Sequence, residues 1–228
     1  MQTMGDFPTL STGYSHVPPG YVASVVTCLE MNSRPTLPNA DLPPNVTLVE
    51  LDRQNLDAYR TLYRKIGSDW LWYSRLVMDD SALSAILGDD AVEVFAVQGH
   101  GSDIGLLELD FRTSRECELA FLGLAKTSVG KGLGRALINN AINRAWSRPI
   151  SRMWVHTCSL DHPSALQFYI RSGFTPYALR IESEPDPRLT GHLPLDAAPH
   201  IPVIAPAVAN DFGVPKTTGE AAPKRTLA

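Results

Sequence analysis

The chain has 228 residues, 44% of them hydrophobic, which is enough for one domain with a buried core. A formal net charge of −4, without a broad basic stripe, argues against nucleic acid or an anionic membrane as a partner. No apolar run approaches a membrane span, the start lacks the layout of a secretion signal, and three scattered cysteines without metal-ligand spacing predict a cytoplasmic protein that needs no metal.

Proline marks the expected domain boundaries, because seven of the 18 prolines precede residue 46 and eight follow residue 184. We therefore predict an N-terminal arm (1–45), a compact domain (46–184) and a proline-rich C-terminal arm (185–228) whose last part is flexible. Within the first arm, β-branched and apolar residues predict a strand at Tyr21–Met31. We expect this strand to add to a sheet edge or to lie at the contact between two copies of a homodimer.

The compact domain is predicted to alternate strands and helices in the order β-α-α-β-β-β-α-β-α-β. The expected elements up to the glycine-rich turn are a strand at Val46–Leu51, a helix at Gln54–Ile66, an aromatic segment at Asp69–Leu76, a helix from Asp80 or Ser81 to Leu87, and strands at Ala91–Gln98, Ile104–Phe111 and Glu116–Leu124. After that turn and its helix come a strand at Arg152–Cys158, a helix at Asp161–Arg171 with Asp161 as N-cap, and a strand at Tyr177–Glu182.

A glycine-rich turn leads directly into an amphipathic helix at Val129–Trp146. Apolar residues recur every four positions from Leu133, whereas Arg135 and Asn139 belong to the opposite, polar side. The unpaired N–H groups at such a helix start favour an anion, most often phosphate. A tight turn with glycines required only for packing is the alternative.

Two motifs in this part of the chain resemble the GNAT superfamily of acyl-CoA N-acyltransferases. The family pattern Gln/Arg-x-x-Gly-x-Gly/Ala falls on Val129–Gly134, with valine at its first position, and the pattern Ala-x-x-Leu-Tyr-x-x-x-Gly-Phe resembles Ala165–Phe174. The resemblance covers about residues 46–183. It implies an α/β (α+β) GNAT fold, with a mixed central sheet of about six to seven strands flanked by about four helices.

The resemblance also implies acetyl-CoA as co-substrate and a set of residues that bind it. The glycine-rich turn would hold the pyrophosphate, a bulge at the end of the preceding strand would offer backbone groups to the pantetheine arm, and the Leu124 N–H would bond the thioester oxygen. The expected cofactor-binding residues are Leu122, Leu124, Val129, Gly130, Lys131, Gly132, Leu133, Gly134, Arg135, His162 and Tyr169.

For catalysis, the family pattern places a general base at Glu118 and a general acid at Tyr169. Glu118 would take the proton of the acceptor amine, and Tyr169 would protonate the departing thiolate. Glu116 and His156 are the other candidates for the base. The alternative for Glu118 is an edge carboxylate paired with a basic neighbour, and for Tyr169 a tyrosine that packs in the core.

The expected acceptor is a small-molecule primary amine, bound by Trp70, Trp72, Tyr73 and His156. Arg75 and Arg112 are both candidates to pair with an acceptor carboxylate, which would make the acceptor amino-acid-like. Cys158 is expected to be a small buried residue rather than a nucleophile. A dinucleotide-binding or Walker loop does not fit the glycine spacing. A non-catalytic acyl-CoA sensor with this fold and acetylation of a protein or peptide amine stay open.

Overall fold

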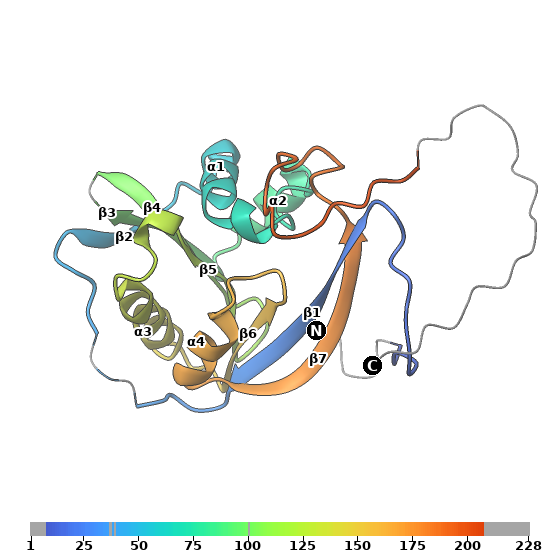
Figure 1. Cartoon of the computed structure of the whole chain (residues 1–228). Coiled ribbons are helices and arrows are strands. Elements are labelled where there is room, and N and C mark those ends of the chain that lie inside the picture. The colour runs from blue at the N-terminus through green and yellow to red at the C-terminus, as the bar shows by residue number, and fades with distance from the viewer. Residues whose placement is uncertain (1–7, 37, 39, 100, 208–228) are drawn as a thin grey trace, which may run out of the picture.

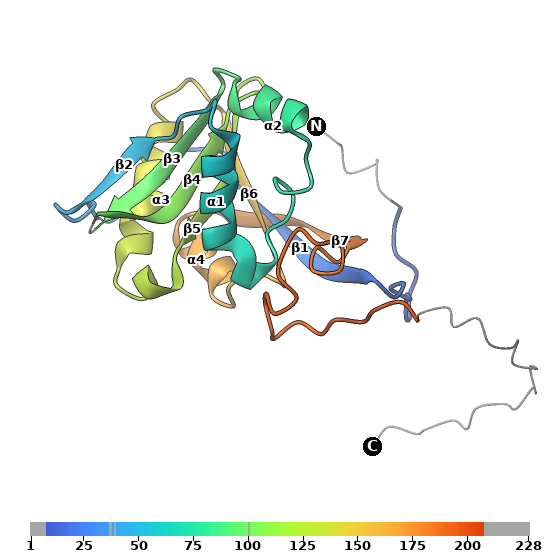
Figure 2. The same cartoon turned by 90° about the horizontal axis from the view of Figure 1, so that it is seen from above.

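The computed structural model describes residues 8–36, 38, 40–99 and 101–207. Its elements, in chain order, are β1 (Tyr21–Met31), β2 (Val46–Glu50), α1 (Leu56–Gly67), η1 (Ser68–Trp70), α2 (Asp80–Leu87), β3 (Val92–Gly99), β4 (Ser102–Asp110), β5 (Glu116–Leu124), η2 (Lys126–Ser128), α3 (Leu133–Ala145), β6 (Arg152–Cys158), α4 (Ala165–Arg171) and β7 (Thr175–Pro185). The strands form one sheet in the order β2-β3-β4-β5-β6-β1-β7, with helices on both faces (Figure 1, Figure 2). This confirms the predicted mixed α/β sheet and element order.

The sheet is antiparallel except at its centre, where β5 and β6 run parallel. Those two strands pair only from Glu116 opposite Arg152 to Glu118 opposite Trp154. Beyond that point β5 continues to pair with β4 as far as Leu124, while β6 continues beside β1. The sheet therefore opens between β5 and β6 at the carboxyl ends of both strands.

Strand β5 carries a β-bulge at Ala120. Leu119 lies opposite Leu109 and Phe121 lies opposite Glu108, so Ala120 is one residue more than the ladder with β4 requires. The family resemblance implies a bulge at the end of this strand, but the bulge lies in the middle of the strand. Because a bulge bends and twists its strand, it accounts for the divergence of β5 from β6.

Strand β1 is an interior strand, so its expected place at a sheet edge is wrong. It pairs with β6 through residues such as Val26 and Leu29, and it pairs along its other side with β7. The returning β7 covers the edge that β1 would otherwise present. The sheet edge is β7 itself, where Leu179 and Ile181 are 71% and 51% exposed.

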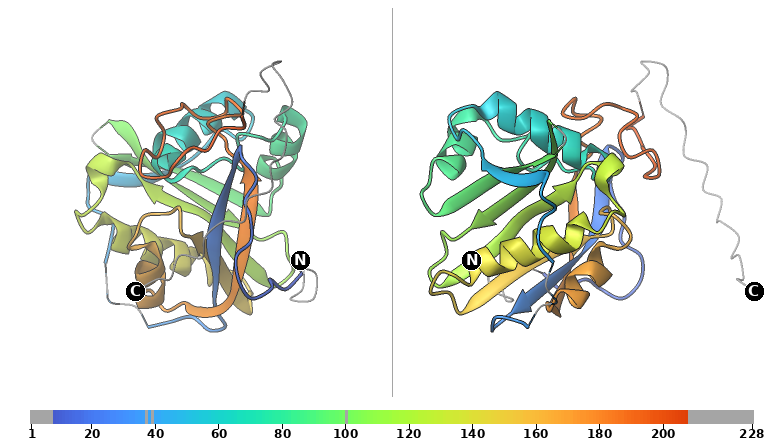
Figure 3. Two further views of the ribbon diagram at one scale, coloured as in Figure 1. Left: turned by 45° about the vertical axis from the view of Figure 1, so that its right-hand side comes forward. Right: turned by 90° about the vertical axis from the view of Figure 1, so that its left-hand side faces the viewer.

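Two apolar cores lie on the two faces of the sheet. Helices α3 and α4 pack on one face, against residues that include Leu29 and Leu107. Helices α1 and α2 pack on the other face together with the segment 193–198 from the C-terminal part of the chain. Figure 3 shows that segment running beside α1 and α2. It is held by Arg188, whose Nη1 donates to the Ala197 carbonyl at 3.2 Å and whose Nη2 lies 2.7 Å from Asp186 Oδ2 in a buried ion pair.

Four helix details differ from the sequence-based expectation. Helix α1 begins at Leu56 because Asn55 caps it, and α2 is capped by Asp79. Helix α4 begins only at Ala165, since the Asp161 carboxylate serves other donors than the helix N-terminus. Asn139 is buried in α3 rather than exposed, and its amide nitrogen donates to the Pro38 carbonyl.

Among the described residues, no helix has both the length and the apolar character needed to cross a membrane.

Candidate active site

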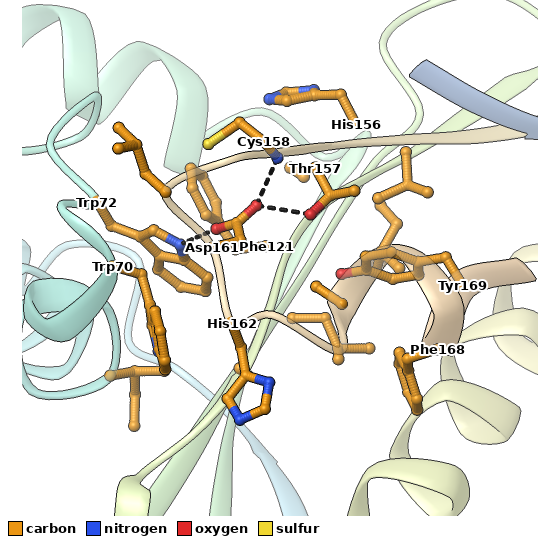
Figure 4. A pocket seen from close by; sticks show the side chains of 18 of the residues that line it. Trp70, Trp72, Phe121, His156, Thr157, Cys158, Asp161, His162, Phe168 and Tyr169 are labelled. Atoms are coloured by element: carbon orange, nitrogen blue, oxygen red, sulfur yellow. Dashed lines mark hydrogen bonds between the residues drawn. The ribbon is translucent and has the colours of Figure 1, made fainter. Parts of the chain in front are cut away.

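A cavity of about 320 Å³ lies where β5 and β6 diverge. Its walls come from β5, the end of β6, helix α4 and the segment 70–74 that follows α1 (Figure 4). Of the residues predicted for a site, the cavity is lined by Trp70, Trp72, Tyr73, Leu122, Leu124, Val129, Gly134, His156, His162 and Tyr169. The gap in the sheet thus brings most of the predicted cofactor and acceptor residues to one place.

One wall offers the free backbone edge of β5. The Ala125 N–H donates to the Ile104 carbonyl of β4, 2.8 Å away, so this pair is hydrogen-bonded across the ladder. Because such pairs alternate along antiparallel strands, the N–H and C=O groups of Leu122 and Leu124 point away from β4. They face the gap that β6 has left, where an extended ligand chain can add to the edge.

The glycine-rich turn lies at the start of α3, beside this edge. Gly130 and Gly132 have φ of +80° and +77°, a region that β-branched residues rarely adopt. In the part of the chain that the structure describes, no side chain caps the N-terminus of α3. Its first N–H groups are therefore available to an anion, and the helix dipole favours one there.

The two cations of this turn differ in their surroundings. Lys131 is exposed at the turn, where it can act as a point charge on an anion. Arg135 instead ties α3 to α4, because its Nη1 donates to the Arg171 carbonyl at 3.2 Å and contacts Ser172 Oγ at 3.4 Å. The structure therefore gives Arg135 a bridging contact as well as its place near the turn.

Glu118 belongs to a cluster of three acids and two arginines on the α1 face of the sheet. Glu108 is completely buried and bonds Arg75 at 2.6 Å, whereas Asp110 bonds Arg112 at 2.6 Å. Both arginines are thus engaged with other carboxylates. Burial and the neighbouring Asp110 charge raise the pKa of Glu118 to about 7. A carboxyl group with this pKa can accept a proton near neutral pH.

Glu118 lies beside the cavity rather than among the residues that line it. His156 connects the two, since its Nδ1 lies 3.7 Å from Glu118 Oε1 and its ring lines the cavity. This distance is too long for a direct hydrogen bond. Desolvation lowers the pKa of His156. Glu116, the reserve candidate, bonds Arg152 Nη1 at 3.0 Å and does not line the cavity.

Tyr169 comes from α4 and its hydroxyl group points into the cavity (Figure 4). Its ring is fixed by edge-on contacts with Phe168 and Phe174, at centroid distances of 5.5 and 5.9 Å. Burial, and then the charge of Asp161, raise the pKa of Tyr169 above its ordinary value. The phenol therefore stays protonated at neutral pH and can donate a proton or a hydrogen bond.

His162 lies at the mouth of the cavity. Its Nδ1 faces the Ser164 N–H at 3.2 Å, which makes this nitrogen an acceptor and leaves the proton on Nε2. The ring also contacts Trp70 edge-on at 5.1 Å. His162 can therefore offer an Nε2–H donor at the place where the family resemblance implies a contact with the pantetheine.

Asp161 is a site residue that the sequence interpretation missed, because it was assigned to a helix cap. Its carboxylate accepts from the Cys158 N–H at 2.9 Å, from Thr157 Oγ1 at 2.7 Å and from Trp72 Nε1 at 3.2 Å (Figure 4). It thereby links the aromatic segment after α1 to the end of β6. No local pattern signals this link, because Trp72 is 89 residues away.

The remaining candidates have different surroundings. Arg75 and Arg112 bond Glu108 and Asp110, so the expectation that either would pair with an acceptor carboxylate does not match their contacts. Cys158 lines the cavity, and burial raises the pKa of its thiol to about 11, which disfavours a thiolate nucleophile. The described residues contain no group of three or more histidine, cysteine or acidic side chains placed to hold a metal ion.

Comparisons with known proteins agree with this geometry. Residues 56–174 match the model of the acetyltransferase (GNAT) family, while no curated protein matches the sequence. A GCN5-related N-acetyltransferase from Sphaerobacter thermophilus superimposes with a TM-score of 0.54 at 13% identity, over 72% of this chain and 53% of that one. A protein assigned to the GNAT family from Novosphingobium aromaticivorans gives 0.51 at 14% identity, over 74% and 68%.

The lengths of the matched structures differ from that of this chain. The chain covers 53% of the Sphaerobacter protein and 64% of a conserved Staphylococcus epidermidis protein of unknown function, which is 13% identical with a TM-score of 0.46. At these identities the Sphaerobacter and Novosphingobium structures show a likeness of fold.

Proposed function

Because this chain belongs to the GNAT acetyltransferase family, we propose that it transfers the acetyl group of acetyl-CoA to a primary amine of a small molecule. The observation that carries the proposal is one cavity lined by the free β5 edge, the start of α3 and the Tyr169 hydroxyl, with Glu118 beside it. Two substrates can meet there, so the reaction proceeds by direct attack in a ternary complex.

The chain's own residues suit acetyl-CoA along the cofactor wall. The uncapped N-terminus of α3 and the turn at Gly130–Gly134 bind the pyrophosphate, with Lys131 as a nearby charge. The backbone of Leu122 and Leu124 bonds the pantetheine arm, and the Leu124 N–H is placed to donate to the thioester oxygen as negative charge develops on it. Because residue 129 is a valine, backbone groups rather than a long polar side chain bind the pyrophosphate at this position.

The chemistry requires one proton acceptor and one proton donor. Glu118 takes a proton from the ammonium form of the acceptor, through a water molecule or through His156, and this frees the nitrogen lone pair. The nitrogen attacks the thioester carbonyl carbon, a C–N bond forms, and the C–S bond breaks. The CoA thiolate leaves with a proton from Tyr169, the attacking nitrogen loses its second proton through water to the Tyr169 phenolate, and the product is a neutral amide.

A turnover assay tests this function. Thiol release from acetyl-CoA is measured over a panel of primary amines, and acetyl-CoA binding is measured separately by calorimetry. We expect Tyr169→Phe to lower kcat by about 100-fold with little change in the KM for acetyl-CoA. Tyr21→Phe is the matched control, because it removes the same hydroxyl group from an exposed tyrosine on β1.

Three results would count against parts of this proposal. An unchanged kcat for Tyr169→Phe would remove Tyr169 as the acid. Binding of acetyl-CoA without thiol release on any amine would favour a non-catalytic acyl-CoA sensor, and release only with peptides would favour a protein or peptide acceptor.

A further inference from the structure

The acceptor end of the cavity has an aromatic wall. The ring of Tyr63 lies 5.6 Å from that of Trp72 and 4.9 Å from that of Phe121, and the rings of Trp72 and Phe121 are 5.2 Å apart. Trp72 and Phe121 line the cavity together with Trp70 and are partly exposed, whereas Tyr63 is completely buried and packs against them. Such a surface stabilises an aromatic ring by stacking and an ammonium group by cation–π attraction.

This wall is fixed by contacts within the chain. Trp72 Nε1 donates to Asp161, and the Trp72 side chain packs closely on Gly67 and Gly123, where even a Cβ atom would lie within 3 Å of it. The indole therefore spans from β5 to the end of β6 in one orientation. A preformed aromatic surface binds a ring with little loss of side-chain entropy.

The charges at this end are mainly negative. Glu182 of β7 lines the cavity, and burial together with the Glu182 charge raises the pKa of the Tyr73 hydroxyl. Glu118 lies beside His156 on the same side of the cavity. A cationic amine is favoured between these groups, and a second negative charge is disfavoured.

The arginines near this end are already engaged. Arg75 and Arg112 bond Glu108 and Asp110, and Arg180 of β7 has an interaction of its own. Arg171, the arginine that lines the cavity, belongs to α4 on the cofactor wall. The charge of Arg180 acts on His156, so an acceptor carboxylate would meet this cation together with the carboxylates of Glu182 and Glu118, and the surplus of negative charge disfavours it.

We propose that the acceptor is a small primary amine that carries an aromatic ring and has no carboxylate, an inference that rests on the function proposed above. The cavity volume of about 320 Å³ is near the lower end of ligand sites, about 300 Å³. Since the pantetheine arm shares that volume, the acceptor has room for one ring system and a short chain.

Matched acceptor pairs test the inference directly. Phenethylamine is compared with phenylalanine, and tryptamine with tryptophan, so that each pair differs in the carboxylate alone; butylamine is the amine without a ring. We expect kcat/KM for each aromatic amine to exceed that of its amino acid by at least about 100-fold. It should exceed that of butylamine by about tenfold or more.

A charge variant separates recognition from chemistry. Glu182→Gln should raise the KM for phenethylamine by about tenfold with a smaller change in kcat. The variant should also lower the ratio of kcat/KM for phenethylamine to kcat/KM for phenylalanine. Glu184→Gln is the matched control, because it makes the same change two residues further along β7, at a side chain that does not line the cavity.

The outcomes distinguish this inference from the proposed function. Equal or better turnover of phenylalanine, or of butylamine, would overturn the acceptor class while acetyl transfer itself stands. An unchanged preference in Glu182→Gln would overturn the role of the β7 carboxylate. Thiol release with none of the five amines, despite acetyl-CoA binding, would contradict both the acceptor class and small-molecule acetyl transfer.

Discussion

Replacement of Glu118 by glutamine removes a carboxyl group whose ionisation the fold disfavours. Burial, and then the charge of Asp110, raise the pKa of Glu118 from 4.5 to about 7. Since one pKa unit corresponds to about 1.4 kcal/mol, ionised Glu118 costs about 3 kcal/mol of folding free energy. The side chain is 24% exposed, so solvent screening reduces this value only in part.

The sign of the effect follows from the two pKa values. In the unfolded chain the carboxyl group ionises near pH 4.5, whereas in the folded chain it stays protonated until about pH 7. The wild-type protein therefore loses this contribution to its stability as the pH rises between the two values. Glu118→Gln lacks the titration, so its free energy of unfolding should rise relative to wild type by about 3 kcal/mol over this interval and then stay level.

Urea unfolding followed by circular dichroism at pH 5, 6, 7 and 8 measures this difference. Glu116→Gln is the control on the same strand, because it makes the same change at a carboxylate that is bonded to Arg152. In the turnover assay, the wild-type kcat/KM should increase with pH through about 7, and Glu118→Gln should lose that limb. A stability difference that is flat with pH would refute the argument from burial and charge.

Three further predictions address other parts of the site. Gly132→Val should weaken acetyl-CoA binding at least tenfold in calorimetry, because valine disfavours the φ of +77° at the start of α3; unaltered affinity would contradict the anion site. Gly123→Ala should lower the free energy of unfolding by about 1–3 kcal/mol in urea, since its Cβ would lie 2.5 Å from Ile66; Gly134→Ala, with its Cβ 3.6 Å from Phe168, is the tolerated comparison. We expect two copies of the chain to associate through the β7 edge. Ile181→Lys should therefore convert the dimer to a monomer in light scattering, and an unchanged molecular mass would exclude that edge as the dimer contact.

Local patterns were sufficient for most of the fold. Strands β5 and β6 have the boundaries expected from their apolar residues, and the glycine turn precedes α3 as predicted. These features depend on the period of apolar residues and on glycine at positive φ, both of which are properties of neighbouring positions. The family motifs then placed Tyr169 and Leu124 near the same cavity.

The rest depends on contacts between distant residues. The interior position of β1 follows from pairing with β7, which lies more than 140 residues away in the chain. From the sequence, Arg75 was a candidate to pair with an acceptor carboxylate. Its burial beside Glu108 could not be predicted, because it depends on how the segment after α1 packs on β4. The role of Asp161 could not be predicted either, because its carboxylate accepts a hydrogen bond from Trp72 Nε1, which lies far away in the sequence. Charged residues are the hardest to assign, since their partners come from other elements.

The bulge at Ala120 bends β5 but is not needed for the pairing between β4 and β5. Deletion of this residue would leave every pair between β4 and β5 in place, because the flanking residues already match one to one. The strand would lose its bend, however, and would be free to run alongside β6 for its whole length. We therefore expect deletion of Ala120 to give a folded chain in which the gap between β5 and β6 is closed. In this chain the pairing of β5 with β4 and the opening between β5 and β6 thus depend on different residues.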